Sequence, residues 1–322
     1  TKMIPAAELV LLTSVVFSIT ILRFFIQLIG VIYLAYQKSS MNDLIVTISS
    51  LISLACVWQV SILLPPGNIV LLALIITLIP VLTYLAFTII AFSTIFKEIR
   101  PSIKYVRMNF AKPLFVLSSR FFLMQITALI IYSSANIMIV NLFNPHEVIV
   151  YNIAFTLFGG TIMIMRICLS PVWSSVTDAY AAGDFNFLNK MMRRLNYLSL
   201  IFSIGVVLLL SVSELFYELW LKGKVHVPFK LSLAMAIYAI IYMFQAAYSM
   251  YINGFGKLKI TVALTLLGIA VYFAGAILLS KYLNSSAGVI LAIALTSIIG
   301  LTMQGIQVKK LLNRKATGWW NI

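Results

Sequence analysis

The sequence predicts an all-α membrane protein, a bundle of about nine transmembrane helices. Of its 322 residues, 62% are hydrophobic and only 10% are charged, and its mean hydropathy is +1.06. Because a soluble globular domain carries about 25% charged residues, this chain has too few charges to cover a water-facing surface. The apolar stretches are long enough to cross the bilayer as helices, which takes about 20 residues. They are too long and too uniformly apolar to be barrel strands.

The nine predicted spans follow one another with short connections. They cover residues 5–36, 43–64, 67–95, 113–141, 147–175, 195–216, 229–253, 259–281 and 286–311. The first span lacks the short apolar region and cleavage site of a signal peptide, and the chain begins with Thr1. We therefore expect a fragment whose N-terminal helices are missing.

The spans divide into two predicted lobes. Residues 1–96 form a partial N-terminal lobe of three spans, and 113–312 form a six-helix C-terminal lobe. The basic segment 97–112, within "FKEIRPSIKYVRMNFAKP", is predicted to be a cytoplasmic linker, with a cytoplasmic tail at 313–322. This segment is also suited to lie on anionic lipid headgroups.

The basic residues predict the orientation. Fifteen of the 23 lysines and arginines fall in one alternate set of connections and five in the other, with three inside spans. Cationic loops stay in the cytoplasm, so we expect a cytoplasmic C-terminus. Because the charges alternate between loops and form no single face, nucleic-acid binding is not expected.

One polar stretch, "SPVWSSVTDAYAAGDF", interrupts the apolar pattern between the fifth and sixth spans. Pro171 weakens the end of its helix, Gly183 suits a C-terminal cap, and Asp184 suits the N-cap of the next, amphipathic helix at the membrane surface. Asp178 and Asp184 supply too few oxygens for calcium, and they face no obvious catalytic pocket. We interpret both as capping and turn residues, and expect no metal site or cofactor.

Three motifs resemble those of bacterial polysaccharide (O-antigen) flippases of the multidrug/oligosaccharidyl-lipid/polysaccharide exporter superfamily. They are "PVWSSVTDAYAAGDF" followed by "MMRRL", then "ANIMIVNLFNPHEVIVYNIAFTLFG", and "YINGFGKLKI", which contains Asn253, Gly254, Gly256 and Lys257. The resemblance covers about 113–312 by motif and 1–96 by hydropathy alone. It implies a two-lobed exporter fold in which the first helix of this chain corresponds to the fourth helix of the family.

Three arginines lie inside the spans, in the order of functional interest Arg23, Arg166 and Arg120. A central arginine costs about 2.5–3.5 kcal/mol to insert, so Arg23 is expected to face a cavity or a partner. Arg120 is close enough to a span end to snorkel to the headgroups. Guanidinium groups bind phosphate oxygens, and the resemblance implies an undecaprenyl-pyrophosphate-linked sugar chain as cargo.

Uncharged polar residues inside the spans have two possible roles: they hydrogen-bond sugar hydroxyls, or they form hydrogen bonds between helices. Hydrogen bonds between helices are the more frequent role of such residues in membrane proteins. They are Gln27, Gln59, Gln125, Asn136, Asn141, Asn152, Gln245 and Gln304, of which Gln27, Gln245 and Asn152 are the substrate candidates. Gly159 and Gly160 are expected to pack tightly against a neighbouring helix.

The expected function is a transporter of the bacterial inner membrane that flips a lipid-linked oligosaccharide by alternating access. Membrane lipids and other polysaccharide assembly proteins are the further expected partners. The alternatives are a cation-coupled multidrug exporter and, less favoured, a membrane-embedded polysaccharide polymerase or ligase. Enzymes of that kind need a sizeable external loop with catalytic groups, and every predicted external loop is short. No P-loop glycine motif is present, so direct use of ATP is not expected.

Overall fold

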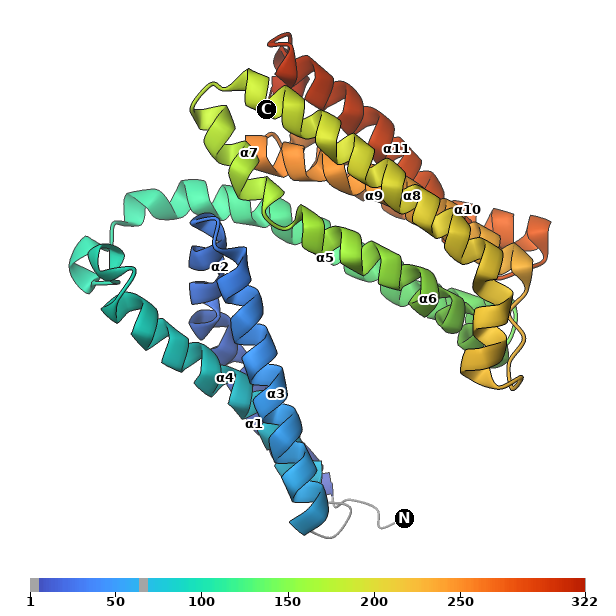
Figure 1. The fold of residues 1–322 in the computed structure, drawn as a ribbon, viewed down its shortest axis with the longest axis horizontal. Coiled ribbons are helices and arrows are strands. Elements are labelled where there is room, and N and C mark those ends of the chain that lie inside the picture. The colour runs from blue at the N-terminus through green and yellow to red at the C-terminus, as the bar shows by residue number, and fades with distance from the viewer. Residues whose placement is uncertain (1–5, 64–68, 322) are drawn as a thin grey trace. The chain divides into compact units, whose positions relative to one another are not determined.

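The described part of the chain is helical throughout. A computed structural model describes residues 6–63 and 69–321, and every regular element in these residues is a helix (Figure 1). The helices are α1 (Ala6–Ile26), α2 (Leu28–Ala35), α3 (Ser39–Leu63), α4 (Ile69–Ser93), α5 (Ala111–Leu142), α6 (Pro145–Leu169), α7 (Val172–Ala181), α8 (Phe185–Leu221), α9 (Phe229–Phe255), α10 (Lys259–Leu283) and α11 (Ala287–Leu312). Short 3₁₀ turns cover Lys97–Ile99, Ile103–Tyr105, Met108–Phe110 and Gly318–Asn321.

The prediction of nine spans is confirmed. Within the described residues, nine helical segments are long and apolar enough to cross a membrane, from Leu12–Ala35 to Ala287–Leu312. The tight connection expected between the second and third spans, residues 64–68, lies outside the described residues.

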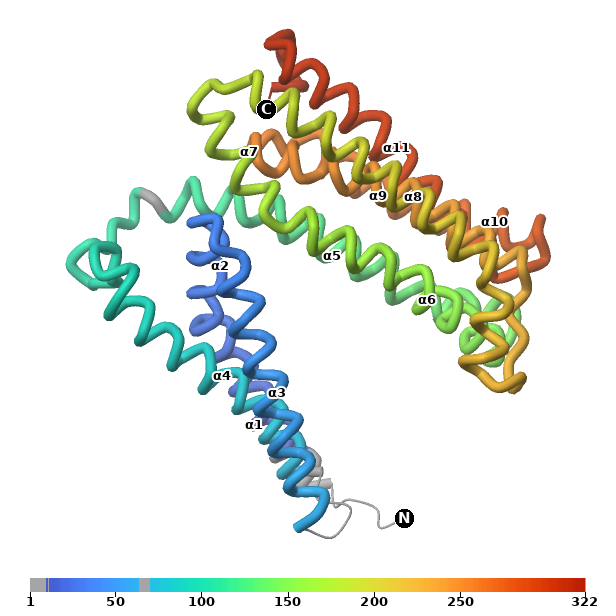
Figure 2. The backbone as a smooth tube through the Cα atoms, viewed as in Figure 1, coloured from blue at the N-terminus to red at the C-terminus, as the bar shows by residue number. Residues whose placement is uncertain are grey.

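The chain divides into two compact units, Thr1–Arg107 and Met108–Ile322. Their boundary falls inside the basic segment that the sequence suggests as a linker. The path of the backbone through each unit can be followed in Figure 2.

Unit 1 is built around a small aromatic core. Tyr33 from α2 and Tyr84 from α4 are each 1% exposed, and Phe96 contacts Tyr33 with its ring centroid 5.2 Å away. The first span is interrupted where α1 ends and α2 begins. There Gly30 N–H donates to Gln27 O (2.9 Å), a tighter, three-residue spacing than the α-helix uses. A side chain at Gly30 would overlap the Asn42 amide, so this glycine lets α2 and α3 approach closely.

Unit 2 is organised around α9, the most buried of its spanning helices. This helix packs against α6, α7, α8 and α11, while α10 packs against α11 and α5. Alanines at 234, 236, 239, 246 and 247 are buried along α9. Small side chains let helix backbones approach each other, which is the usual basis of helix association in membranes.

The structure extends one expectation about the helices and overturns another. The amphipathic segment after Asp184 is continuous with the sixth span, because α8 runs through both as one helix of 37 residues. At 1.5 Å per residue this helix is about 55 Å long. It therefore exceeds the hydrocarbon core by several turns. The expected tight packing of Gly159 and Gly160 is wrong, because no atom of another described helix lies within 4 Å of the place that a Cβ would take at either residue.

The polar junction between α6 and α8 has the capping geometry that the sequence predicts. Asp184 Oδ1 accepts from the Phe187 N–H (2.9 Å), and Gly183 has a positive φ of 72° at the end of α7. Pro171 is the N-cap of α7, and the backbone oxygen of Asp178 accepts from Ala182 near the helix end. The cap at Asp184 and the glycine end of α7 are confirmed.

Two of the three motifs, the one around α7 and the one at the end of α9, pack against each other. A Cβ at Gly254 would lie 2.6 Å from Val176 Cγ1, and Thr177 Oγ1 donates to Gly254 O (3.1 Å). The rings of Tyr180 and Phe255 are 4.7 Å apart. The motif residues therefore attach α7 to the end of α9.

The turn after α9 holds the C-terminal tail. Gly256 has φ 67° and its N–H donates to Asn253 O (3.1 Å), which ends α9. Lys257 Nζ donates to Asn321 O (2.8 Å), and buried Gln307 donates from its amide to Lys257 O (3.1 Å). These contacts give Asn253, Gly256 and Lys257 a structural role at this end of unit 2.

Removing the Asp184 cap is expected to destabilise the junction. Asp184→Ala leaves the Phe187 N–H without its side-chain acceptor, which costs about 1 kcal/mol. Asp184→Asn keeps an oxygen acceptor and serves as the matched control. Thermal unfolding of the purified protein in detergent checks this, and equal midpoints for alanine and asparagine would contradict the capping role.

Candidate functional site

Unit 1 contains a cavity beside the deepest arginine. The cavity has a volume of about 410 Å³, is open on one side, and is lined by residues of α1, α3 and α4. Its polar lining consists of Arg23, Ser49, Ser50, Ser53 and Tyr84, with Pro80 of α4 on the wall. Arg23 Nε is buried and has no hydrogen-bond partner among the described residues. The cavity thus carries a permanent positive charge, and none of its lining residues is acidic.

A short polar network adjoins Arg23. Gln27 lies one turn further along the same face of the first span, and its side chain is within hydrogen-bonding reach of the Tyr84 hydroxyl. Tyr84 Oη also donates to Asn42 Oδ1, at 3.4 Å. The structure therefore brings together two of the sequence candidates, Arg23 and Gln27.

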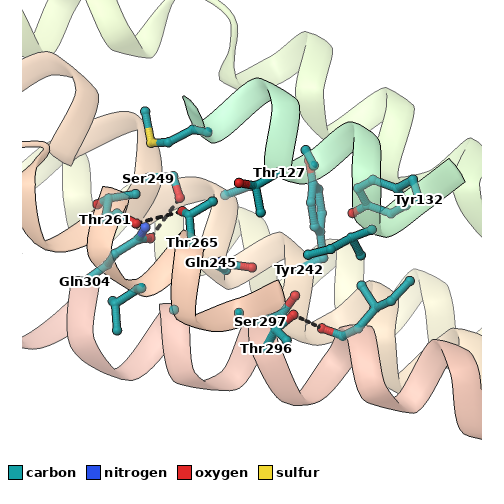
Figure 3. A pocket seen from close by; sticks show the side chains of 18 of the residues that line it. Thr127, Tyr132, Tyr242, Gln245, Ser249, Thr261, Thr265, Thr296, Ser297 and Gln304 are labelled. Atoms are coloured by element: carbon teal, nitrogen blue, oxygen red, sulfur yellow. Dashed lines mark hydrogen bonds between the residues drawn. The ribbon is translucent and has the colours of Figure 1, made fainter. Parts of the chain in front are cut away.

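Unit 2 contains a second, uncharged cavity. It has a volume of about 310 Å³ and lies between α5, α9, α10 and α11 (Figure 3). Hydroxyl and amide groups from all four helices line it, among them Thr127, Gln245, Ser249, Thr261, Thr265 and Gln304. Tyr132 and Tyr242 contribute aromatic rings, and no lining residue is charged.

Several hydroxyls of this second cavity already donate their protons within the protein. Ser249 Oγ donates to Gln304 Oε1 (2.8 Å), and Gln304 is only 3% exposed. Thr127 and Thr265 donate to carbonyls of their own helices, at 2.9 and 2.7 Å. Such hydroxyls retain lone pairs and can still accept hydrogen bonds. Thr261 Oγ1 is buried without any partner in the described chain.

Gln245 occupies its place because α11 carries a glycine opposite it. A side chain at Gly300 would overlap the Gln245 amide, so the glycine gives this amide room at the cavity wall. Gln245 is the candidate substrate residue that the structure positions in the second cavity. The serine and threonine members were not among the candidates, although the spacing of four residues between Gln245 and Ser249, and between Thr261 and Thr265, puts each pair on one helix face.

The other candidates lie elsewhere in unit 2. Arg166 is exposed on α6, and its charge is close enough to act on the Tyr132 hydroxyl, which lies 2.6 Å from the Tyr238 hydroxyl. Arg120 is half-buried on α5 and Asn152 is half-buried on α6, and neither lines the cavity. Metal binding has no support in the described residues, where no group of three or more His, Cys, Asp or Glu side chains could hold an ion.

The described helices indicate a multi-pass membrane protein, and each of its two helical units contains a cavity lined in part by polar side chains. No protein-family model matches the chain. No curated protein has significant sequence similarity to it.

Proposed function

We propose that this chain belongs to a membrane transporter that flips an oligosaccharide linked to undecaprenyl pyrophosphate across the bacterial cytoplasmic membrane. The observation that carries the proposal is Arg23. Its guanidinium lies in a spanning helix beside a cavity of about 410 Å³, and its buried Nε is unpaired among the described residues.

The reason is the cost of such a charge. A central arginine in a membrane helix costs about 2.5–3.5 kcal/mol, and intramembrane charges usually mark a substrate pathway. A guanidinium stays protonated and binds phosphate oxygens through two parallel hydrogen bonds. A pyrophosphate headgroup therefore suits a cavity whose described lining offers a cation and no carboxylate.

The charge distribution of unit 2 supports a cytoplasmic C-terminus. The contacts of Tyr251 with Leu188 and of Lys257 with Asn321 join the α7–α8 junction, the α9–α10 turn and the tail at one end. The basic residues at this end are Lys190, Arg193, Arg194, Lys257, Lys259, Lys309, Lys310, Arg314 and Lys315. Cationic ends remain in the cytoplasm, next to anionic lipids. The transporter is expected to take its cargo from that side, by alternating access.

A reconstitution assay tests the proposal. Liposomes holding the full-length protein receive fluorescent undecaprenyl-pyrophosphate oligosaccharide in one leaflet, and a membrane-impermeant quencher reports how fast it reaches the other leaflet. We expect faster exchange than in protein-free liposomes. Exchange at the protein-free rate would overturn the proposal.

The same liposomes separate the alternative functions. Export of a cationic dye that depends on a sodium or proton gradient, without lipid exchange, would identify a cation-coupled drug exporter. Elongation of the glycan, read by chromatography of the extracted lipids, would identify a polymerase.

A further inference from the structure

We propose that the uncharged cavity of unit 2 is a binding site for one neutral, polyhydroxylated group of the size of a single sugar ring. This inference rests on the proposed function, because it identifies the part of the cargo that unit 2 binds. It assigns sugar recognition to the four-helix cavity between α5, α9, α10 and α11, which is a different chamber from the Arg23 cavity of unit 1.

The first argument is charge. None of the residues that line the unit 2 cavity is acidic or basic, although the chain as a whole carries +15. An ion held there would have no charged group in the lining to pair with, and an unpaired buried ion is costly. Arg166, whose charge acts on the Tyr132 hydroxyl, is exposed on α6 and is not part of the lining. The cavity therefore suits a neutral group, in contrast to the cationic cavity around Arg23.

The second argument is which hydrogen-bonding groups of the lining remain free to accept or donate. Ser249, Thr265 and Thr296 each donate to an oxygen of the protein, at 2.7 to 2.8 Å, so each hydroxyl keeps lone pairs that can accept from a ligand. Thr261 Oγ1 is unpaired within the described chain, and Gln245 presents an amide that both donates and accepts. A ligand that matches this lining must donate several hydrogen bonds, which hydroxyl groups do.

The third argument is shape. Figure 3 shows Ser249, Thr261, Thr265 and Gln304 gathered toward one end of the cavity, with Tyr132 and Tyr242 toward the other. A volume of about 310 Å³ is at the lower end of the range for small-molecule sites. A sugar ring has hydroxyls on its rim and an apolar C–H face, so it can contact both the polar end and the tyrosine rings.

The competing account is a cavity filled by water alone. At about 30 Å³ per molecule, this volume would hold roughly ten waters. Water would satisfy the same acceptors, but it would not discriminate between a carrier lipid with a sugar and one without. That difference is the basis of the test.

Cysteine protection tests the site in the full-length protein. Cys56 and Cys168 are both free, so they are first changed to serine. A single cysteine is then introduced by Ser249→Cys or, separately, Thr265→Cys, and Thr317→Cys on the exposed tail is the control. The label is a small uncharged methanethiosulfonate. The probes are undecaprenyl pyrophosphate alone and undecaprenyl pyrophosphates that carry one sugar of gluco, galacto or manno configuration.

We expect at least one sugar-bearing lipid to slow labelling of the cavity cysteines about threefold or more, while the sugar-free carrier and the tail control show no protection. Equal protection by the sugar-free carrier, no protection by any probe, or no labelling of either cavity cysteine would overturn the inference. The flipping assay separates this failure from that of the proposed function. Normal glycan exchange without sugar-dependent protection would contradict only the sugar site in unit 2. Exchange at the protein-free rate would contradict the proposed function itself.

Discussion

We expect Arg23→Ala to slow the exchange of pyrophosphate-linked glycan about tenfold or more in proteoliposomes. Hydrogen bonds to charged groups contribute about 1.5–3 kcal/mol, and 1.4 kcal/mol corresponds to a factor of ten. Arg23 is the one charged residue among the described residues that line its cavity, so the alanine variant leaves the pyrophosphate without a cation in that cavity. The measurement is the initial rate of quencher-resistant exchange at equal protein content.

Two variants control for charge and for structure. Arg23→Lys keeps the positive charge but loses the planar two-pronged geometry, so it should give an intermediate rate. Arg107→Ala removes an exposed cation from the basic segment and should exchange at the wild-type rate. Wild-type exchange by Arg23→Ala would contradict the phosphate-binding role.

Stability supplies an independent readout for the same residue. Arg23 Nε is buried and has no hydrogen-bond partner in the described chain, so replacing the side chain with leucine removes an unsatisfied buried donor. We expect Arg23→Leu to unfold at a temperature equal to or above that of wild type while it transports poorly. A purely structural arginine would show the opposite, with a lower unfolding temperature and unchanged transport per folded molecule.

The largest stability loss is expected at Gly288. A Cβ there would overlap the backbone of α10 at Ser280 and Leu279, so α10 and α11 would have to separate. Backbone atoms cannot rotate away as a side chain can. Overpacking of this kind costs about 1–3 kcal/mol or more. Gly288→Ala should therefore lower the thermal midpoint in detergent by roughly 5 °C, given about 2–4 °C per kcal/mol for a unit of this size.

Gly159→Ala is the matched control for that substitution. Both glycines lie in helices of unit 2, but nothing lies within 4 Å of the position that a Cβ would take at Gly159. Alanine has a higher helix propensity than glycine by about 0.8–1 kcal/mol. The control should be neutral or slightly stabilised, and a midpoint for Gly288→Ala equal to that of Gly159→Ala would show that the contact between α10 and α11 can relax.

Local signals in the sequence were sufficient for the helices and their ends. Long apolar runs predicted the nine spans because helices are the structures that satisfy the backbone of such runs in lipid. Gly183 and Asp184 predicted the ends of α7 and α8, since caps depend on residues adjacent in the chain. The continuity of α8 was missed because an amphipathic turn pattern does not reveal whether the helix bends into the surface or runs on.

The candidate sites were predictable only in part. Arg23 stood out because a guanidinium in mid-membrane is costly, and it does line a cavity. The hydroxyl-rich cavity of unit 2 was not foreseen beyond Gln245, because its members come from four helices that are separated by up to about 180 residues in the sequence. Serine and threonine are also common inside membrane helices, where they usually bond their own backbone, so each one alone gives no signal.

The sequence by itself determined that this protein is a helical membrane protein, where its spans lie, which ends are basic, and that one arginine lies well inside the first span. Those properties depend on hydropathy and charge along the chain. Only the tertiary structure decided which polar groups share a chamber. In the folded protein Thr177 is hydrogen-bonded to Gly254, and the Gln245 amide packs against Gly300. One uncharged cavity is lined by Ser249, Thr261, Thr265 and Gln304. The physical reason is that helices in lipid associate through close packing of particular faces, and those pairings are formed between residues far apart in the sequence.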